Sequence, residues 1–241
     1  MRRIFIMICL LLLFAGCSTY YNPVTEKEEY TIYTEQDEIE MGVAIDKKLQ
    51  RENKIVETPQ NIKEIVEKIG KVSDRPNLTY TVRVIKNDEI NAFATPGGFI
   101  YLYTGLLEKA GSEDEIANVI GHETGHICAR DGINQLQKTL LYSIPASILL
   151  SNKSAAIKKT VDAAFTITML KYSREQELRA DKLGVTYAYR AKYNPEGMIS
   201  FFKKLQDIEK KAPSLKITFL SSHPDIADRI SNVEKVIKEL Q

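Results

Sequence analysis

The chain has 241 residues, of which 44% are hydrophobic, and its 33 basic side chains nearly balance 32 acidic ones. This length suits one domain with a real core. The near-zero net charge does not provide the basic surface that nucleic-acid binding requires, so we expect no nucleic-acid partner.

The first residues are typical of an export signal. Arg2 and Arg3 precede an apolar stretch, residues 4–14, that is too short for a comfortable membrane span. The small residues and cysteine that follow resemble the lipobox of bacterial lipoproteins, with cleavage before Cys17 and lipid on its sulfur and amine. The alternative is an ordinary secretory peptide with an incidental cysteine. We expect a signal peptide over residues 1–16.

A lipidated Cys17 would hold the protein on a membrane, because several fatty chains anchor stably where one does not. Ser18, the next residue, favours release to the outer membrane of a two-membrane bacterial envelope, with the protein facing the periplasm. We expect residues 17–34 to be the lipidated end and a polar tether, and residues 35–241 to be one domain. Cys128 is expected as a core residue without a disulfide partner.

The predicted elements of the domain are mostly helical. In chain order they are helices over 35–49 and 59–73 (Thr58 as N-cap), strands over 78–85, 91–95 and 98–104, a helix over 112–130, a mostly helical segment over 133–172 broken near Pro145, and helices over 173–191, from Asn194 to before Pro213, and from His223 onward. Ser112 and Glu115 predict a capping box. The fold class is therefore α+β, mostly α, with one small sheet.

The most informative motif lies in the helix over 112–130. His122, Glu123 and His126 form the H-E-x-x-H pattern, in which positions i and i+4 share a helix face, so both imidazoles can bind one metal ion. The glutamate is offset toward a water on that metal, from which it can take a proton. The plain alternative is a buried helix with two histidines that hydrogen-bond within the core.

A catalytic zinc site usually takes three protein ligands and one water. Glu177 and Asp181 lie four residues apart on a later helix and share a face, which suits a glutamate ligand and a carboxylate that accepts the free N–H of His122. The alternative is an exposed helix in which Arg174 and Arg179 pair with these acidic residues.

Several blocks in order give the chain a family resemblance. They are residues 91–101 (NAFATPGGFIY) with 104–107 (TGLL), 121–126 (GHETGH), 173–181 (SREQELRAD), and 222–224 (SHP) with 228–230 (DRI). The chain resembles the gluzincin peptidases that include the CaaX prenyl protease and the HtpX heat-shock protease. Within them it is most similar to the periplasmic lipoproteins typified by BepA and LoiP, without the helical-repeat domain of BepA.

The resemblance implies a zincin-like peptidase fold with its small sheet beside the active-site helix. It also implies one Zn²⁺ ion per chain, bound by His122, His126 and Glu177, with Glu123 as general base. The expected activity is endoproteolysis of unfolded or misassembled envelope proteins, which is protein quality control. The rival reading is a lipoprotein chaperone or assembly factor whose zinc site is structural; further protein partners are left open.

Three further expectations concern substrate and regulation. Gly98, Phe99, Ile100 and Tyr101 are expected to form an exposed edge strand that pairs with an extended substrate, which would give weak sequence preference. Residues 133–170, which join the two helices that carry the expected ligands, are either a lid over the cleft or a plain helical hairpin.

His223 is the only histidine outside the metal motif. It is expected either as a fourth zinc ligand that keeps the enzyme latent, or as a catalytic group that hydrogen-bonds the oxyanion. The plain alternative is a loop histidine near the start of the last helix.

Overall fold

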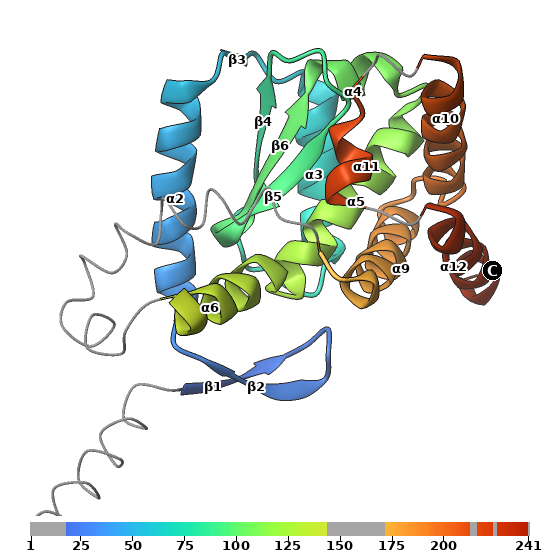
Figure 1. The fold of residues 1–241 in the computed structure, drawn as a ribbon. Helices are drawn as coiled ribbons and strands as arrows, with labels where there is room; N and C mark the ends of the chain where they lie inside the picture. Colours follow the sequence, from blue (N-terminus) through green and yellow to red (C-terminus); the bar gives the residue numbers. More distant parts are fainter. Residues whose placement is uncertain (1–17, 144–171, 213–215, 224–225, 241) are drawn as a thin grey trace, which may run out of the picture.

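The computed structural model describes residues 18–143, 172–212, 216–223 and 226–240 (Figure 1). The expected signal peptide, Cys17 and residues 144–170 of the expected lid lie outside this part. Among the described residues, no helix is both long enough and apolar enough to cross a membrane.

The described strands are β1 (Ser18–Asn22), β2 (Lys27–Thr31), β3 (Ile55–Val56), β4 (Thr81–Ile85), β5 (Ala92–Thr95) and β6 (Phe99–Tyr103). The helices are α2 (Glu35–Glu52), α3 (Gln60–Val72), the 3-10 turn η1 (Pro96–Gly98), α4 (Thr104–Lys109), α5 (Glu113–Cys128), α6 (Asp131–Ser143), α9 (Arg174–Arg190), α10 (Gly197–Lys211), α11 (Thr218–Ser222) and α12 (Ile226–Leu240). The expected α+β class, mostly α, is confirmed.

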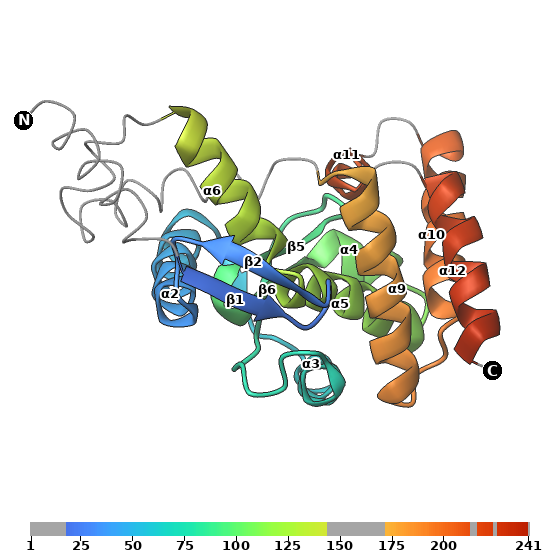
Figure 2. The ribbon, with the colours of Figure 1, turned by 90° about the horizontal axis from the view of Figure 1, so that it is seen from below.

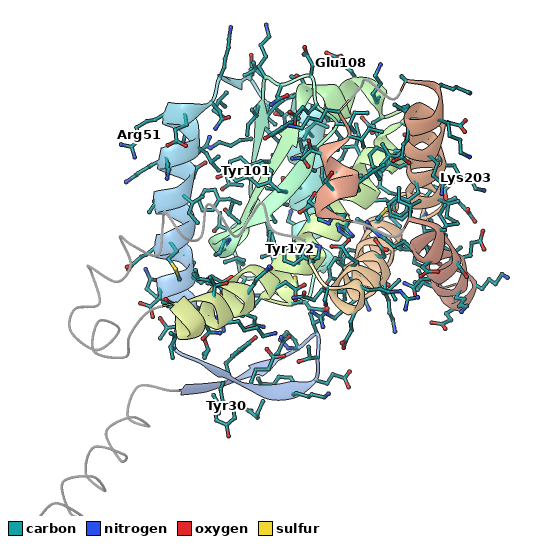
Figure 3. The ribbon with its side chains drawn as sticks, viewed as in Figure 1. Tyr30, Arg51, Tyr101, Glu108, Tyr172 and Lys203 are labelled. Carbon is teal, nitrogen blue, oxygen red and sulfur yellow. The ribbon has the colours of Figure 1, made fainter. Side chains whose placement is uncertain are left out.

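One four-stranded sheet forms the centre of the domain, with strand order β3-β4-β6-β5. Strand β6 is parallel to β4 and antiparallel to β5. Both faces of the sheet are covered (Figure 1): α2 and α6 pack on one face, and α3 and α5 on the other. Side chains of a strand alternate between faces. Tyr101 accordingly lies on the α2 side (Figure 3). Its hydroxyl donates to Asp46 at 2.9 Å, while Ile100 joins the opposite cluster.

The segment 18–31 is not the expected polar tether. It forms an antiparallel hairpin of β1 and β2, which lies below α6 in Figure 1 and against α6 in Figure 2. Cross-strand hydrogen bonds hold it: the Tyr20 hydroxyl donates to Glu29 at 2.7 Å, and the Asn22 amide donates to the same carboxylate at 3.0 Å. The polar residues that suggested a tether thus pair with one another across a two-stranded ribbon.

Three smaller expectations about helix ends are wrong. Pro59, not Thr58, is the N-cap of α3. Ser112 caps α5 as expected and accepts from the Glu115 amide at 3.2 Å, but the Glu115 carboxylate accepts from Lys204 at 2.6 Å instead of closing a capping box. His223 ends α11, a short helix that the sequence pattern did not predict, and the last helix begins at Ile226.

Helices α5 and α9 cross with their backbones almost in contact. A Cβ atom on Gly121 would lie 2.6 Å from the Gly184 carbonyl oxygen, and a Cβ atom on Gly184 would lie 2.6 Å from the backbone nitrogen of His122. Such a contact permits no side chain at either position. The crossing places the H-E-x-x-H turn of α5 directly against α9 (Figure 1).

We expect Gly184→Ala to lower the free energy of unfolding by about 1–3 kcal/mol, because the new methyl group must separate two packed helices. Urea denaturation measures this. The matched control is Gly132→Ala on α6, where the nearest heavy atom to a new Cβ would be 3.8 Å away. Equal urea midpoints for the two variants would contradict the close helix crossing.

Candidate metal centre

Helix α5 directs its two motif histidines toward one point. His122 and His126 are one helical turn apart, and both are buried. Their Nε2 atoms are 3.1 Å apart. At this distance the two nitrogen lone pairs would repel each other, so the nitrogens must share either a proton or a metal ion.

Two further side chains complete the cluster. Glu177 of α9 places its carboxylate oxygens 3.5 Å from His122 Nε2 and 3.4 Å from His126 Nε2. His223 places Nδ1 3.2 Å from His122 Nε2 and 2.9 Å from a Glu177 oxygen. One ligand atom from each of the four residues lies within 4.8 Å of the other three, and all four residues are buried.

The spacing of these atoms fits a metal ion. Two nitrogens bound to zinc at about 2.1 Å with a tetrahedral angle lie about 3.4 Å apart. The nitrogen pairs of this cluster are 3.1 and 3.2 Å apart, close to that distance. Imidazole and carboxylate groups together suit zinc and related divalent ions. The cluster therefore has the composition and the size of a four-coordinate metal site.

Glu123 is a buried carboxylate without a hydrogen-bond partner in the described part of the chain. The imidazole of His223 lies beside it, with Nε2 3.7 Å from Glu123 Oε1. Burying a carboxylate without partners is costly, so such a group is retained for a function outside the core packing. Its place, one residue after His122, leaves it free to contact a group bound at the metal position.

Carboxylates hold the outward nitrogens of both motif histidines. Asp181 Oδ1 lies 2.9 Å from His122 Nδ1, the contact expected from the sequence. Asp131, which the sequence analysis did not select, has Oδ2 2.9 Å from His126 Nδ1. Each carboxylate accepts an N–H there, so each Nε2 keeps its lone pair for a metal. Asp131 begins α6 directly after the motif helix, and this proximity was the available signal.

Arg229 of α12 ties the cluster together and was also missed. Its guanidinium donates to both oxygens of Asp181, at 2.7 and 2.6 Å, and to the His223 carbonyl oxygen at 3.0 Å. It also pairs with Glu177 at 3.1 Å. The arginine lies in the 228–230 block, but the sequence alone did not connect it to α9.

The alternative reading of α9 as an exposed, charge-paired helix is wrong. Glu177 and Asp181 are both 0% exposed. Arg179 donates to Asp131 at 2.5 Å, whereas Arg174 pairs on the surface with Asp228. Tyr172 lies just before α9 (Figure 3) and stacks on the His126 ring with centroids 4.0 Å apart, a contact that the sequence analysis did not anticipate.

Neighbouring charged groups shift the pKa values of Glu177 and His126 in the direction opposite to the shift that burial causes. Burial raises the pKa of Glu177, but the nearby His223, His126 and His122 outweigh it and hold this pKa well below its usual range. Burial lowers the pKa of His126, but Asp131 and Glu177 more than offset it and raise the pKa to about 10. Burial also lowers the pKa of His122. The carboxylates thus favour a cation at this position, and metal binding must displace protons.

The expectation that residues 98–101 form an exposed edge strand is wrong. Strand β6, which contains Phe99, Ile100 and Tyr101, pairs with β4 and β5 and is therefore not an edge. Gly97 and Gly98 have φ values of +78° and +94°, and a Cβ atom on Gly98 would lie 2.3 Å from the Thr79 carbonyl oxygen. These glycines form the turn between β5 and β6 and approach their own chain.

Comparison with known proteins adds independent evidence. The profile of peptidase family M48 matches residues 57–237, which include all four cluster residues and Glu123. The mitochondrial metalloendopeptidase OMA1 of Saccharomyces cerevisiae is 28% identical over 94% of this chain and 73% of its own length. OMA1 of Arabidopsis thaliana is 33% identical over 61% of this chain and 29% of its own.

A bacterial relative is the beta-barrel assembly-enhancing protease of Escherichia coli, 30% identical over 66% of this chain and 34% of its own length. This chain thus spans most of the yeast protein but only about a third of the plant and bacterial ones. The family profile covers well over half of the chain and contains the buried cluster. The chain therefore belongs to peptidase family M48 and is a metalloendopeptidase.

Proposed function

We propose that this metalloendopeptidase uses zinc, is anchored through lipid on Cys17 in the bacterial outer membrane, and cleaves unfolded or misassembled envelope proteins in the periplasm. The observation that carries the proposal is the buried convergence of His122, His126 and Glu177 beside the unpartnered carboxylate of Glu123. The printed name of the Escherichia coli relative, a beta-barrel assembly-enhancing protease, supports an envelope role.

Each residue of the cluster has a defined task in this proposal. Bound zinc would polarise the scissile carbonyl and lower the pKa of a water molecule. His122, His126 and Glu177 would hold it. Glu123 takes the proton of the attacking water and later gives it to the leaving amine. Asp181 is the second-layer carboxylate that keeps His122 in the tautomer with Nε2 free.

The substrate is proposed to bind along β5 rather than β6. Among the described strands, β5 pairs only with β6, and we propose that an extended chain pairs with its other side. Ala94 and Thr95 of β5 line a small cavity together with His126, which puts this edge beside the cluster. Main-chain pairing is available to any extended polypeptide, so we propose unfolded chains as substrates with weak sequence preference.

The rival function is a lipoprotein chaperone with a structural zinc site. It is favoured by one observation: His223 Nδ1 lies among the other three ligand groups, and a fourth protein ligand would close the site. Digestion of casein, with and without a chelator, separates the two functions. Proteolysis that stops on chelation and returns with zinc excludes the chaperone reading.

We expect Glu123→Gln to keep zinc binding and the fold but to lower kcat at least about 100-fold, because the amide retains the shape of the carboxylate and cannot take a proton. Casein hydrolysis and zinc content, measured on the same preparation, check this. Retention of more than a few per cent of wild-type activity would overturn the mechanism.

We expect Glu177→Ala to lower the zinc content per chain, because it removes one of three ligands. The matched control is Glu175→Ala, an exposed residue on the same helix, which should retain full zinc content. Arg179 is unsuitable as a control because it contacts Asp131. Equal zinc content in the two glutamate variants would remove Glu177 from the site.

We further propose that His223 occupies the fourth zinc position at rest and holds the protease latent. Two contacts support this role over the oxyanion role: Nδ1 lies among the ligand atoms, while Nε2 faces Glu123 at 3.7 Å, so the imidazole stands between the base and the metal position. The expected outcome is that His223→Ala raises basal casein hydrolysis severalfold.

The control for this variant is Ser222→Ala, whose hydroxyl donates only to carbonyls of its own short helix. A fall in turnover with zinc affinity unchanged would instead support the oxyanion role. Wild-type turnover and unaltered zinc spectroscopy in His223→Ala would exclude both roles.

The proposed anchor is tested at Cys17. We expect Cys17→Ser to move the protein from the detergent-extracted membrane fraction to the soluble periplasmic fraction or to leave it unprocessed, because the acylated cysteine is the attachment point. Membrane fractionation followed by immunoblotting checks this. An unchanged fractionation pattern would refute the lipoprotein assignment and leave the peptidase assignment intact.

A further inference from the structure

The turn between α5 and α6 has an unusual backbone. Arg130, the second of the two residues in the turn, has φ +54° and is buried, whereas the other non-glycine residues with positive φ in the described part, Glu26 and Lys192, are exposed. Glycine adopts this left-handed conformation at least cost. An arginine retained there indicates that its side chain has a task that compensates for the backbone strain.

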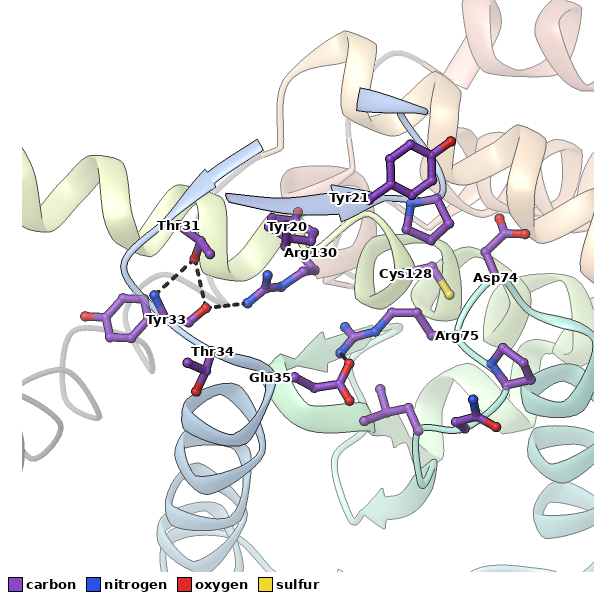
Figure 4. A pocket seen from close by; sticks show the side chains of 14 residues that line it. Tyr20, Tyr21, Thr31, Tyr33, Thr34, Glu35, Asp74, Arg75, Cys128 and Arg130 are labelled. Atoms are coloured by element: carbon purple, nitrogen blue, oxygen red, sulfur yellow. Dashed lines mark hydrogen bonds and ion pairs between the residues drawn. The ribbon is translucent and has the colours of Figure 1, made fainter. Parts of the chain in front are cut away.

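The guanidinium of Arg130 joins three segments. Its Nε donates to Glu38 of α2 at 2.9 Å, and its Nη2 donates to the Tyr33 carbonyl oxygen at 3.0 Å. It also lies over the ring of Tyr20 in β1, 4.2 Å from the centroid. Figure 4 shows Arg130 between the hairpin and the start of α2, with the bond to Tyr33 drawn.

A second arginine strengthens the same connection. Glu38 is 1% exposed and also accepts from Arg75 Nη1 at 3.0 Å. Arg75 in turn donates to the Ile127 carbonyl oxygen, in the last turn of α5, at 3.2 Å. Two guanidinium groups therefore share one buried carboxylate; Arg75 bonds to the last turn of α5, and Arg130 belongs to the turn that follows it. Removing one of these three charged side chains would leave the buried charges of the others incompletely paired, which is destabilising.

The N-terminal hairpin holds both sides of this turn. The Asn22 amide donates to the Ala129 carbonyl oxygen at 3.3 Å, just before Arg130. The Asn134 amide donates to Glu29 at 3.3 Å, just after it. The hairpin lies outside the part of the chain that matches the family profile.

The turn leads directly to the metal cluster. Asp131 follows Arg130 in the chain, and its Oδ2 atom lies 2.9 Å from His126 Nδ1. The ψ angle of Arg130 and the peptide bond after it set the position of Asp131. A change in the turn would therefore move the carboxylate that orients His126.

We propose that Arg130 is a positioning residue for the metal centre: anchored by Glu38 and the hairpin, it holds the left-handed turn that places Asp131 against His126. The inference rests on the proposed zinc site and adds a role for the N-terminal segment in metal affinity. Arg130 itself contacts neither metal nor substrate in this proposal and acts through Asp131.

The test measures the zinc Kd of the full chain by competition with a chromophoric chelator, using the metal alone. We expect Arg130→Ala and Asp131→Asn each to raise the Kd about 10- to 100-fold, as is usual when the partner of a histidine ligand is lost. The double variant should bind zinc within roughly threefold of Asp131→Asn, because two residues that act through one contact are not additive.

Two further variants serve as a control and as a second test of Arg130. Arg83→Ala removes another arginine that pairs with α2, through Asp46 at 2.5 and 2.7 Å, and should lower stability without changing the zinc Kd. Arg130→Gly relieves the strained φ and removes only the side chain, so it decides the question if Arg130→Ala does not fold. We expect it to raise the Kd as the alanine does.

Wild-type zinc affinity in Arg130→Gly, or fully additive losses in the double variant, would overturn the inference. In that case chelator-sensitive proteolysis by the wild type would leave the proposed function standing. A wild type that binds no zinc would instead refute the proposed function itself.

Discussion

The candidate metal centre depends on the backbone contact between α5 and α9, because this contact brings the two pairs of chemically active residues together. The H-E-x-x-H turn lies on one helix and Glu177 with Asp181 on the other. Gly121 and Gly184 let these helices approach until a Cβ atom would be 2.6 Å from the opposite backbone. At that distance the carboxylates of α9 can reach the imidazoles of α5 directly, so three of the four cluster residues are held by two packed helices, and His223 joins them from the end of α11.

The close approach of α5 and α9 buries several charged side chains in the core. Glu123, Glu177, Asp181 and Asp131 are all buried around two motif histidines. Arg229 balances part of this charge from α12, and Arg179 contacts Asp131 from α9. A buried network of this kind adds little net stability but makes the loss of any one member costly. The last helix is therefore part of the site, although it contributes no expected ligand.

The folded hairpin changes how the N-terminal segment relates to the catalytic domain. Strand β1 begins at Ser18, the residue after the proposed lipid attachment point, and Asn22 bonds to the end of the motif helix. If Cys17 carries the lipid, the folded hairpin, and not a flexible linker, sets the distance between the membrane and the active site. The same segment that would anchor the enzyme also braces the turn beside His126.

Local spacing in the sequence was sufficient for the parts of the site that lie on single helices. The i, i+4 pairs His122 with His126 and Glu177 with Asp181 were predictable because the 3.6-residue repeat fixes which side chains share a face. Ser112 as a cap and the strand that contains Tyr101 followed from equally local rules. These signals predicted the metal motif and the fold class, whereas Glu177 as a ligand was an expectation from the family resemblance.

Contacts between distant segments were decided only by the tertiary structure. His223 joins His122 across 101 residues, and Arg229 reaches Asp181 across 48. The burial of β6 between two partners, the folding of residues 18–31, and the bond from Asp131 to His126 likewise depend on which elements pack together. Sequence periodicity specifies the apolar face of an element but not its neighbour, because many partners bury the same area equally well. Backbone contacts such as Gly121 with Gly184 make that selection, and the sequence shows them only as two glycines 63 positions apart.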